Sequence, residues 1–326
     1  MNHLIEAVDL CVTYRAARDQ KVVALSAVSF GIERGEILGV LGESGSGKST
    51  LAAAILGVLH ANGKTERGAV WFEGQDLMRT TETEFQKIRG RKIGTIFQEP
   101  QLALHPCIRI RQQVGDVLTA HRSMSRNASR EQTQRVLSSV FSEEVERIAN
   151  AYPHQLSGGQ RARVLVAQAV VCQPALVIAD EPTASLDPVT QADVISIFRS
   201  LRMERGLGMI LITHNPLLLA GLADRIMILY AGRVVEIGPA ESVLSNPRHP
   251  YTRDLLRSVP PLIESDGVAG ERKLPMIRED LASPTMPGRC VFEARCNDRM
   301  EVCTEREPAR VALTEKHSVA CFKFGG

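Results

Sequence analysis

The chain has 326 residues and lacks the two features that export or membrane insertion would require. Its first ten residues, MNHLIEAVDL, have no cationic start followed by an apolar core and a small-residue cleavage site, so we expect no signal peptide. No uninterrupted apolar run reaches the roughly 18 residues that a spanning helix needs. The longest apolar runs, such as Ala175–Ala179 and Met209–Ile212, have the length of strands. We therefore expect a soluble chain that reaches a membrane only through a partner.

The chain also lacks a strong net charge, internal repeats and low-complexity segments. Its formal net charge is +2, with 44% hydrophobic and 23% charged residues, a balance that argues against disorder. That balance gives no global electrostatic reason to expect nucleic acid as a partner. The length allows one large domain and a smaller appendage.

Short apolar segments alternate with helical stretches between about residues 36 and 230. Four of them are continuously apolar, which is typical of strands buried on both faces: Ile37–Leu41, Ile93–Phe97, Ala175–Ala179 and Met209–Thr213. This pattern predicts an α/β fold with a mainly parallel sheet covered by helices on both sides.

Three further segments are predicted from local signals. Ser129 with Gln132 resembles a capping box that opens a helix ending at Val140. Residues 225–236 predict a hairpin that turns near Ala231 and Gly232. After about residue 238 the pattern weakens, and residues 262–288 predict an irregular linker.

A phosphate-binding loop follows the first of the buried strands. It fits the pattern G-x-x-x-x-G-K-[ST], stands between an apolar strand and a good helix former, and consists of Gly42, Glu43, Ser44, Gly45, Ser46, Gly47, Lys48 and Ser49, with Thr50 next. Glycines let backbone N–H groups face phosphate oxygens, and the helix N-terminus adds partial positive charge. We expect Lys48 to reach the β- and γ-phosphates of ATP and the Ser49 hydroxyl to bind Mg²⁺.

Two carboxylates end the strand at residues 176–179. Ligands gather at such strand ends in open parallel sheets. Asp180 is placed to hold the Mg²⁺ shell, and Glu181 can polarise the attacking water. A strand that simply ends in charges is common, but the phosphate loop upstream favours the catalytic interpretation.

A third motif indicates the family. Leu156, Ser157, Gly158, Gly159 and Gln160 resemble the signature of the ABC (ATP-binding cassette) proteins, and Ser157 lies 23 residues before Asp180, as in that family. The resemblance implies a P-loop ABC cassette with a mainly parallel sheet, an antiparallel β subdomain and a helical subdomain. It also implies that this segment contacts the γ-phosphate of ATP held by a second cassette.

Other positions match the family in chain order. The resemblance implies that one aromatic stacks on adenine, that a Q-loop glutamine touches Mg²⁺ and water, that a D-loop follows the carboxylates, and that a switch histidine contacts the γ-phosphate. These residues are Tyr14, Gln98, the D-loop Ser185, Leu186 and Asp187, and His214. Catalysis is thereby expected from Glu181, His214 and Gln98, with Mg²⁺ bound through Ser49, Gln98 and Asp180.

A second resemblance concerns the tail. Glu241–Leu244 and Asn246–Thr252 are similar to the tail of the ATPases of oligopeptide, dipeptide and nickel importers. It implies a cassette at residues 1–240, with its helical subdomain at about 100–170, and a C-terminal extension at 241–326.

The resemblance also implies partners and a location. They are two transmembrane permease subunits, a second and related ATPase subunit, an extracytoplasmic solute-binding protein and no nucleic acid. The location is the cytoplasmic face of the inner membrane.

The sequence departs from that family at three places. Residues 98–106 read QEPQLALHP where QDPMTSLNP is usual, in the segment where the permease docks in relatives. Asn215 stands where aspartate is commoner, and Arg161-Ala162-Arg163 replaces Arg-Gln-Arg. No catalytic group is lost, so we expect an active ATPase.

The seven cysteines form two groups. Cys11, Cys107 and Cys172 are expected to be small buried hydrophobic residues. The other four have the spacing C-x5-C-x6-C-x17-C and are Cys290, Cys296, Cys303 and Cys321. Four thiolates in a segment with little core could hold a [4Fe–4S] cluster or Zn²⁺. The alternative is four reduced, packed cysteines.

Alternative functions are open at this stage. A soluble ABC ATPase of translation usually has two cassettes, but this chain has one phosphate loop. A DNA-repair type splits its cassette with a long coiled coil, yet Gly42 and Ser157 are only 115 residues apart. An exporter often fuses its membrane helices to the cassette and lacks this tail. The importer is the leading hypothesis, with di- or oligopeptides as substrate and nickel or another small solute as the alternative.

Overall fold

The computed structural model describes residues 3–16, 20–97, 103–122, 124–184, 186–258 and 288–325. Strands and helices alternate along most of the chain. The strands are β1 Ile5–Arg15, β2 Lys21–Ile32, β3 Ile37–Leu41, β4 Gly63–Phe72, β5 Gln75–Asp76, β6 Ile93–Ile96, β7 Leu176–Asp180, β8 Gly208–Thr213, β9 Arg225–Tyr230, β10 Arg233–Pro239, β11 Val311–Thr314 and β12 His317–Val319. The α-helices are α1 Lys48–Leu56, α2 Glu82–Ile88, α4 Ile110–His121, α5 Arg126–Val140, α6 Val145–Asn150, α7 Gly158–Val170, α8 Pro188–Arg205, α9 Ala240–Ser245, α10 Pro250–Arg257 and α11 Val302–Glu305.

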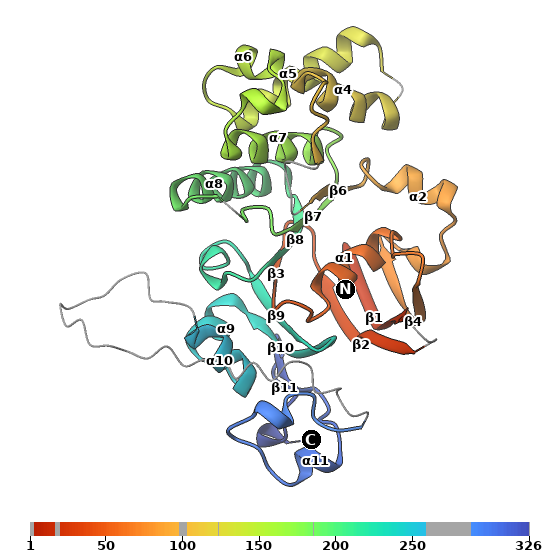
Figure 1. Cartoon of the computed structure of the whole chain (residues 1–326), viewed down its shortest axis with the longest axis vertical. Helices are drawn as coiled ribbons and strands as arrows, with labels where there is room; N and C mark the ends of the chain where they lie inside the picture. The colour runs from red at the N-terminus through yellow and green to blue at the C-terminus, as the bar shows by residue number, and fades with distance from the viewer. Residues whose placement is uncertain are drawn as a thin grey trace, which may run out of the picture.

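The central sheet has eight strands in the order β11-β12-β10-β9-β3-β8-β7-β6. Its middle strands are parallel: β3 pairs with β8 and β9, and β7 pairs with β6 and β8. The four predicted buried strands are all present in this region, with ends that differ from the prediction by a single residue at most. The α/β fold with a mainly parallel sheet that the sequence predicts is therefore confirmed (Figure 1).

Both faces of the central sheet are buried, which explains why its strands are continuously apolar. Successive residues of β3 alternate between two hydrophobic cores: Ile37 and Leu41 contribute to one, Leu38 and Val40 to the other. The first core is shared with helices α4, α5, α7 and α8, and the second with α1 and the antiparallel sheet. Alternation of this kind leaves no strand face for polar residues.

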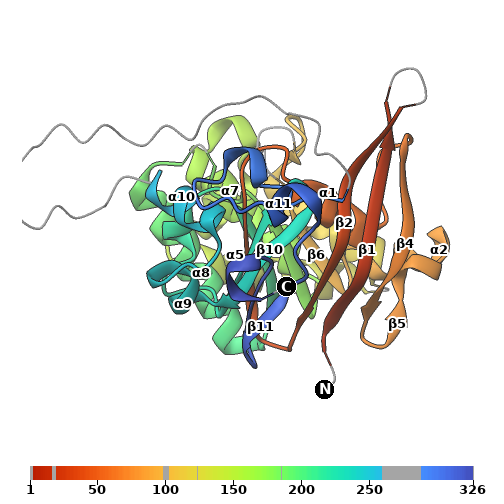
Figure 2. The ribbon, with the colours of Figure 1, turned by 90° about the horizontal axis from the view of Figure 1, so that it is seen from below.

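The second sheet is antiparallel, with strand order β2-β1-β4-β5. It stands beside α1, as Figure 2 shows, and forms the antiparallel part of the predicted cassette. Tyr14, near the end of β1, pairs in register with Gly63 of β4. A Cβ on Gly63 would lie 2.6 Å from the Tyr14 ring, so glycine at this position allows the ring to lie close to the backbone of β4.

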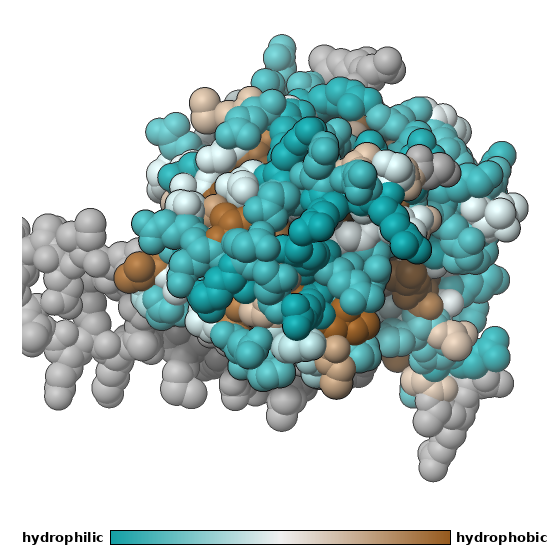
Figure 3. All heavy atoms as spheres, turned by 90° about the horizontal axis from the view of Figure 1, so that it is seen from above, coloured by the Kyte–Doolittle hydropathy of each residue, from teal (hydrophilic) through white to brown (hydrophobic). Residues whose placement is uncertain are grey.

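Helices α4 to α7 form a layer at the end of the molecule farthest from the C-terminus (Figure 1). Viewed from that end, the surface is mostly hydrophilic with small, scattered apolar areas (Figure 3). Over the ranges that the structure covers, no helix is long and apolar enough to span a bilayer.

Two predictions about local structure were wrong. Helix α5 begins after Ser125, whose hydroxyl accepts a hydrogen bond from Ala128 N at 3.3 Å, so Ser125 and not Ser129 is the N-cap. Ser129 lies inside the helix, where its carbonyl oxygen accepts a hydrogen bond from Thr133 Oγ1 at 2.8 Å. Among the three scattered cysteines only Cys172 is buried, and Cys107 is exposed in the turn that precedes α4.

The predicted hairpin at residues 225–236 is confirmed as β9 and β10, which pair antiparallel. Its turn uses Ala231 and Gly232, both with positive φ (46° and 77°), which matches the twist that a two-residue hairpin turn requires. The predicted linker at 262–288 lies outside the described residues apart from Gly288.

The C-terminal extension adds two strands to the central sheet. Strand β12 pairs antiparallel with β10, and β11 pairs with β12. The junction contains a fully buried carboxylate, Glu236, which accepts hydrogen bonds from the backbone N–H groups of Arg248 and His249, each at 2.9 Å. The same carboxylate lies 2.9 Å from Nε2 of His317 on β12. One side chain therefore ties three segments together.

His249 makes the stability of this junction depend on pH. Its Nδ1 accepts a hydrogen bond from Tyr251 N at 3.0 Å, which only a ring that is unprotonated at Nδ1 can do. Burial lowers the pKa of His249 to about 4, with a further contribution from the charge of Arg253. The pKa in the folded state is thus below the usual 6.5, so the unfolded chain binds the proton first. The stability that His249 contributes is complete above about pH 6.5 and is lost as the pH falls from there through about 4.

We expect the free energy of unfolding to fall by about 2 kcal/mol more between about pH 7 and about pH 5 in the natural chain than in His249→Asn. Asparagine keeps a capping acceptor but does not titrate. Denaturant unfolding at the two pH values measures the difference. Equal losses in both chains would contradict the assignment of this titration to His249.

Candidate active site

The phosphate loop connects β3 to α1, as the sequence predicts. Gly47 caps α1 with φ of 105°, and a Cβ there would lie 2.7 Å from the carbonyl oxygen of Ala24. A Cβ on Gly42 would lie 2.2 Å from the carbonyl oxygen of Leu229. Glycine is therefore required at both ends of the loop, which packs directly against the backbone of β2 and β9.

Lys48 is buried at the centre of this loop. Its Nζ donates hydrogen bonds to the carbonyl oxygens of Gly42 and Glu43, both at 2.8 Å. Burial lowers the pKa of Lys48, and the charges of Glu181, Asp180 and Glu43 partly oppose that shift. An ammonium group so placed gains from any anion that enters the loop, because phosphate oxygens would replace two neutral carbonyls as its acceptors.

Asp180 ends β7 next to the loop. Burial raises its pKa, a hydrogen bond with Ser49 and the charge of Lys48 lower it, and the charge of Glu181 raises it further. A divalent cation bound here would offset the electrostatic repulsion between the neighbouring carboxylates of Asp180 and Glu181. Hydroxyl and carboxylate oxygens are the hard donors that Mg²⁺ prefers, so Ser49 and Asp180 fit the role predicted for them.

Glu181 is held in a strained backbone conformation. Its φ is 49°, in the left-handed region that glutamate rarely adopts, and its N–H donates to the carbonyl oxygen of Ile212 at 2.9 Å. Its carboxylate is 2.8 Å from Nδ1 of His214 and accepts a hydrogen bond from Thr213 Oγ1 at 3.4 Å. Strain of this kind persists where the surroundings fix it and is common at active sites.

These residues surround one open pocket of about 510 Å³. Most of the predicted nucleotide-site residues line it, and Ala24, which the sequence analysis did not identify, lines it as well. The lining residues are Tyr14, Ala24, Ser44, Gly45, Gly47, Lys48, Ser49, Thr50, Asp180, Glu181 and His214.

Some predicted residues lie elsewhere. Gly42, Glu43 and Ser46 belong to the loop but are not part of the described pocket lining. The carboxylate of Glu43 instead accepts hydrogen bonds from Arg295 of the C-terminal extension. Gln98 lies outside the described residues.

The signature segment forms the N-terminus of α7, outside the described lining of the phosphate loop pocket. Ser157 caps α7: its hydroxyl accepts from Gln160 N at 3.2 Å, and the Gln160 side chain accepts from Ser157 N at 3.0 Å. Leu156 is buried and anchors the turn, while Ser157 and Gly158 are exposed. A Cβ on Gly159 would lie 2.2 Å from Cγ2 of Thr190, so α7 and α8 approach closely here.

Ser157, Gly159 and Gln160 line a second pocket, of about 280 Å³. Within the described parts of the chain, this pocket shares no lining residue with the first. One chain therefore presents a phosphate loop and a signature helix as two separate half-sites.

The predicted D-loop follows both half-sites in sequence and leads into α8. Asp187 caps α8, accepting hydrogen bonds from Val189 N at 3.1 Å and Thr190 N at 3.0 Å. Hydrogen bonds from Thr190 lower the pKa of this carboxyl. Leu186 packs against the first core, and Ser185 lies outside the described residues. The position of Asp187 thus has a structural role that the motif alone did not predict.

The four C-terminal cysteines lie near one another. Burial raises the pKa of Cys290 to about 11, and the other three thiols of the group raise it further. In the portion of the chain that the structure describes, however, no three or more His, Cys, Asp or Glu side chains form a group that could hold a metal ion.

A phosphate loop, a strand ending in Asp180 and Glu181, and a signature helix define an ATPase of the ABC class. Comparison with known proteins agrees: residues 25–184 match the ABC transporter family, and residues 235–303 match the C-terminal region of oligopeptide/dipeptide transporters.

Curated relatives cover almost the whole chain. The oligopeptide transport ATP-binding protein OppD of Escherichia coli is 38% identical over 98% of this chain and 93% of its own length. The dipeptide transport ATP-binding protein DppD of Bacillus subtilis is 38% identical over 92% of this chain and 89% of its own. The chain therefore belongs to the ABC transporter ATP-binding proteins that carry the oligopeptide/dipeptide C-terminal region, and its enzymatic activity is ATP hydrolysis.

Solved structures show the same fold. The ATP-binding cassette MJ0796, in a dimeric post-hydrolysis state bound to ADP and Pi, has a TM-score of 0.64 and 31% identity, covering 72% of this chain and 98% of its own. The cbiO1 protein of Clostridium perfringens, part of the ABC transporter complex cbiONQ, has a TM-score of 0.65 and 26% identity, covering 76% of this chain and 92% of its own.

We expect Glu181→Gln to bind ATP normally while its hydrolysis rate falls by a factor of roughly 10² to 10⁴, the usual loss when a general base is removed. The amide keeps the shape of the side chain but cannot accept a proton at neutral pH. Steady-state release of phosphate and equilibrium binding of ATP measure the two effects separately. Normal turnover in this variant would exclude Glu181 as the base.

We expect Lys48→Ala to lose about 100-fold in ATP affinity, because two charge-assisted hydrogen bonds to phosphate disappear. Lys87→Ala is the matched control, since Lys87 is an exposed lysine of α2 that does not line the loop pocket. Equilibrium binding of ATP to both variants is the measurement. Undiminished affinity in Lys48→Ala would contradict the phosphate loop assignment.

Proposed function

We propose that this chain supplies the energy for a membrane importer of di- or oligopeptides by hydrolysing ATP between two cassettes. The observation that carries the proposal is the separation of the half-sites, since the described linings of the loop pocket and the signature pocket of one chain have no residue in common. Two chains arranged head to tail would place each signature helix against the other chain's phosphate loop. Each ATP would then be bound by the phosphate loop of one chain and the signature helix of the other.

The proposed chemistry uses the residues of the loop pocket. Lys48 and the loop N–H groups hold the phosphates, and the Tyr14 ring supports the adenine. Water attacks the γ-phosphorus, Glu181 accepts a proton from that water, and the bond to the β-γ bridging oxygen breaks, which yields ADP and phosphate. His214, 2.8 Å from the Glu181 carboxylate, orients it and lies beside the γ-phosphate.

Mg²⁺, held by Ser49 and Asp180 and by the predicted Gln98, would neutralise phosphate charge in the transition state. Residues at the exposed tip of α7 would complete the site from the second cassette. Ser157 would contribute its hydroxyl, and Gly158 and Gly159 would contribute backbone N–H groups at a helix N-terminus, while Gln160 would hold the cap through its hydrogen bonds with Ser157.

The substrate class rests on the C-terminal region and the relatives. The relatives in Escherichia coli and Bacillus subtilis are named as oligopeptide and dipeptide transport proteins, and they align with nearly all of this chain. We therefore propose peptides as the transported solute. The proposed partners are two permease subunits, a second and related ATPase subunit and an external solute-binding protein, at the cytoplasmic face of the membrane.

A [4Fe–4S] cluster or Zn²⁺ with a structural role at the four cysteines stays a prediction from their spacing, because the side chains that the structure describes form no group that could hold a metal ion. Burial raises the pKa of Cys290, Cys296 and Cys321 and so disfavours their thiolate forms. A bound cation would stabilise those thiolates. The ATPase chemistry above does not pass through this group.

We expect the tagged full-length chain, purified from its native membrane in detergent, to bring down two polytopic subunits, a related ATPase and a solute-binding protein. Mass spectrometry of the ligand on that binding protein should find short peptides. Cells that carry Glu181→Gln should lose uptake of the same peptide, while uptake of an unrelated amino acid continues. Recovery with ribosomes or DNA-repair factors and no membrane subunit would overturn the proposal.

A further inference from the structure

The glutamate of the phosphate loop does not face the nucleotide pocket. Glu43 is the first residue after Gly42, yet its carboxylate points to the C-terminal extension. Arg295 donates to both carboxylate oxygens, from Nη1 and Nη2, each at 2.9 Å. This two-point geometry is the strongest and most directional form of an arginine–carboxylate pair.

Every polar group of Glu43 has a defined partner. Its N–H donates to the hydroxyl of Tyr251 at 2.9 Å, and its carbonyl oxygen accepts from Lys48 at 2.8 Å. The N–H, the carbonyl oxygen and the carboxylate of Glu43 are therefore each held by a different residue. Two of these three partners, Tyr251 and Arg295, follow the cassette in sequence.

Arg295 is itself held firmly. Its guanidinium lies over the rings of Tyr230 and Phe292, with its central carbon 5.6 Å and 5.8 Å from the ring centres, and its Nη1 lies 3.3 Å from the Tyr230 hydroxyl. Phe292 is 2% exposed and contacts the rings of Tyr230 and Tyr251. The side chain of Arg295 is 15% exposed, so water screens the pair only partly.

The backbone around Arg295 is a short, closed turn. Residues Glu293–Arg295 form the 3₁₀ helix η5, which stands between Cys290 and Cys296. Cys290 N donates to the carbonyl oxygen of Cys303, which fastens the start of the turn to α11.

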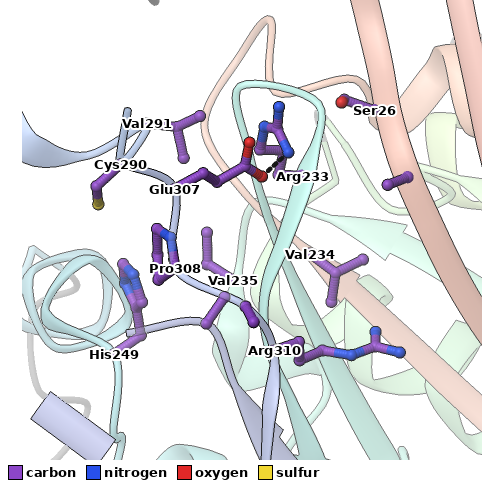
Figure 4. A pocket seen from close by; sticks show the side chains of 13 residues that line it. Ser26, Arg233, Val234, Val235, His249, Cys290, Val291, Glu307, Pro308 and Arg310 are labelled. Carbon is purple, nitrogen blue, oxygen red and sulfur yellow. Dashed lines mark ion pairs between the residues drawn. The ribbon is translucent and has the colours of Figure 1, made fainter. Parts of the chain in front are cut away.

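Next to this turn the extension is not packed tightly on the cassette. A pocket of about 240 Å³ separates them, lined by Val234 and Val235 on one side and by Cys290 and Pro308 on the other (Figure 4). An ion pair between Arg233 and Glu307 crosses it. The position of the turn therefore depends on polar contacts of this kind together with Phe292, which belongs to the first hydrophobic core.

We propose that Arg295 is a positioning residue for ATP binding: it holds the phosphate loop in its binding conformation and neutralises Glu43 beside the phosphates. The proposal rests on the proposed ATPase function. Without Arg295, an unpaired carboxylate in the loop would repel the triphosphate and leave the loop free to move. The C-terminal extension would thereby set the ATP affinity of the cassette.

The test is a double-mutant cycle on the full-length chain with MgATP as the probe. We expect Arg295→Gln to raise the Kd and KM for ATP about tenfold, with kcat changed less than twofold, because Arg295 does not touch the reacting atoms. Glu43→Gln removes the repelling charge, so the double variant Glu43→Gln/Arg295→Gln should bind ATP several-fold more tightly than Arg295→Gln alone. Such rescue would support the proposal, because a role of Arg295 that does not act through the charge of Glu43 would leave the double variant at least as weak in ATP binding as Arg295→Gln.

Two controls keep the result clear. Arg299→Gln removes an exposed arginine of the same extension that pairs with Glu293, and its ATP affinity should match that of the natural chain. If Arg295→Gln fails to fold, Arg295→Lys replaces it, since lysine keeps the charge but can donate to only one point and should give a smaller rise in Kd.

Additive losses, or a fall in kcat with unchanged KM, would overturn the positioning role while leaving the ATPase assignment intact. Failure of the natural chain to bind ATP would overturn both.

Discussion

The active site depends on one geometric constraint, which is the parallel register of three neighbouring strands. In β3, β8 and β7 the ends lie side by side: Leu41 is in register with Thr213, and Asp180 with Ile212. Whatever follows these strands is gathered at one edge of the sheet. The phosphate loop, His214 and Glu181 each follow one of them, so residues more than 130 positions apart in sequence lie around one pocket. Both faces of these strands are buried, one in each of the two hydrophobic cores.

At this edge of the sheet, backbone contacts fix the positions of several site residues. The glycines at both ends of the phosphate loop allow close approach to the carbonyl groups of Ala24 and Leu229, which no other residue permits. Glu181 bears a positive φ because its N–H is paired across to β8. Backbone groups also fix the signature helix, through the reciprocal hydrogen bonds of Ser157 and Gln160. These bonds leave other N–H groups at the tip of the helix available to an incoming phosphate.

Short-range patterns in the sequence were enough to predict much of this arrangement. Lys48, Asp180 and Glu181 belong to local motifs, and the buried strands are marked by uninterrupted apolar residues. Ala231-Gly232 between two apolar segments is typical of a hairpin turn. The N-cap of α5 was misplaced because Ser125 and Ser129 are both acceptable caps, and only the hydrogen bond from Ala128 N to Ser125 identifies the one that is used. Strands β11 and β12 were not predicted, since they are short and join the central sheet only because β12 pairs with β10, more than 70 residues earlier. The pairing of Glu43 with Arg295 joins residues 252 positions apart and carries no local signal.

The buried carboxylate of Glu236 explains why the extension can act on the phosphate loop at all. A charged group in the interior is stable only when hydrogen bonds replace the water it has lost, and its removal from such partners is costly. Here the replacement comes entirely from the extension, through the N–H groups of Arg248 and His249 and the ring of His317. Strand β10, which belongs to the central sheet, is thus fully satisfied only when the extension is folded against it. Cassette and extension are therefore coupled in stability, and the contact between Arg295 and Glu43 is made by a fixed part of the fold. A tail attached only by a linker could not hold two hydrogen bonds at 2.9 Å, because the entropy lost on ordering it would exceed what a partly exposed ion pair returns.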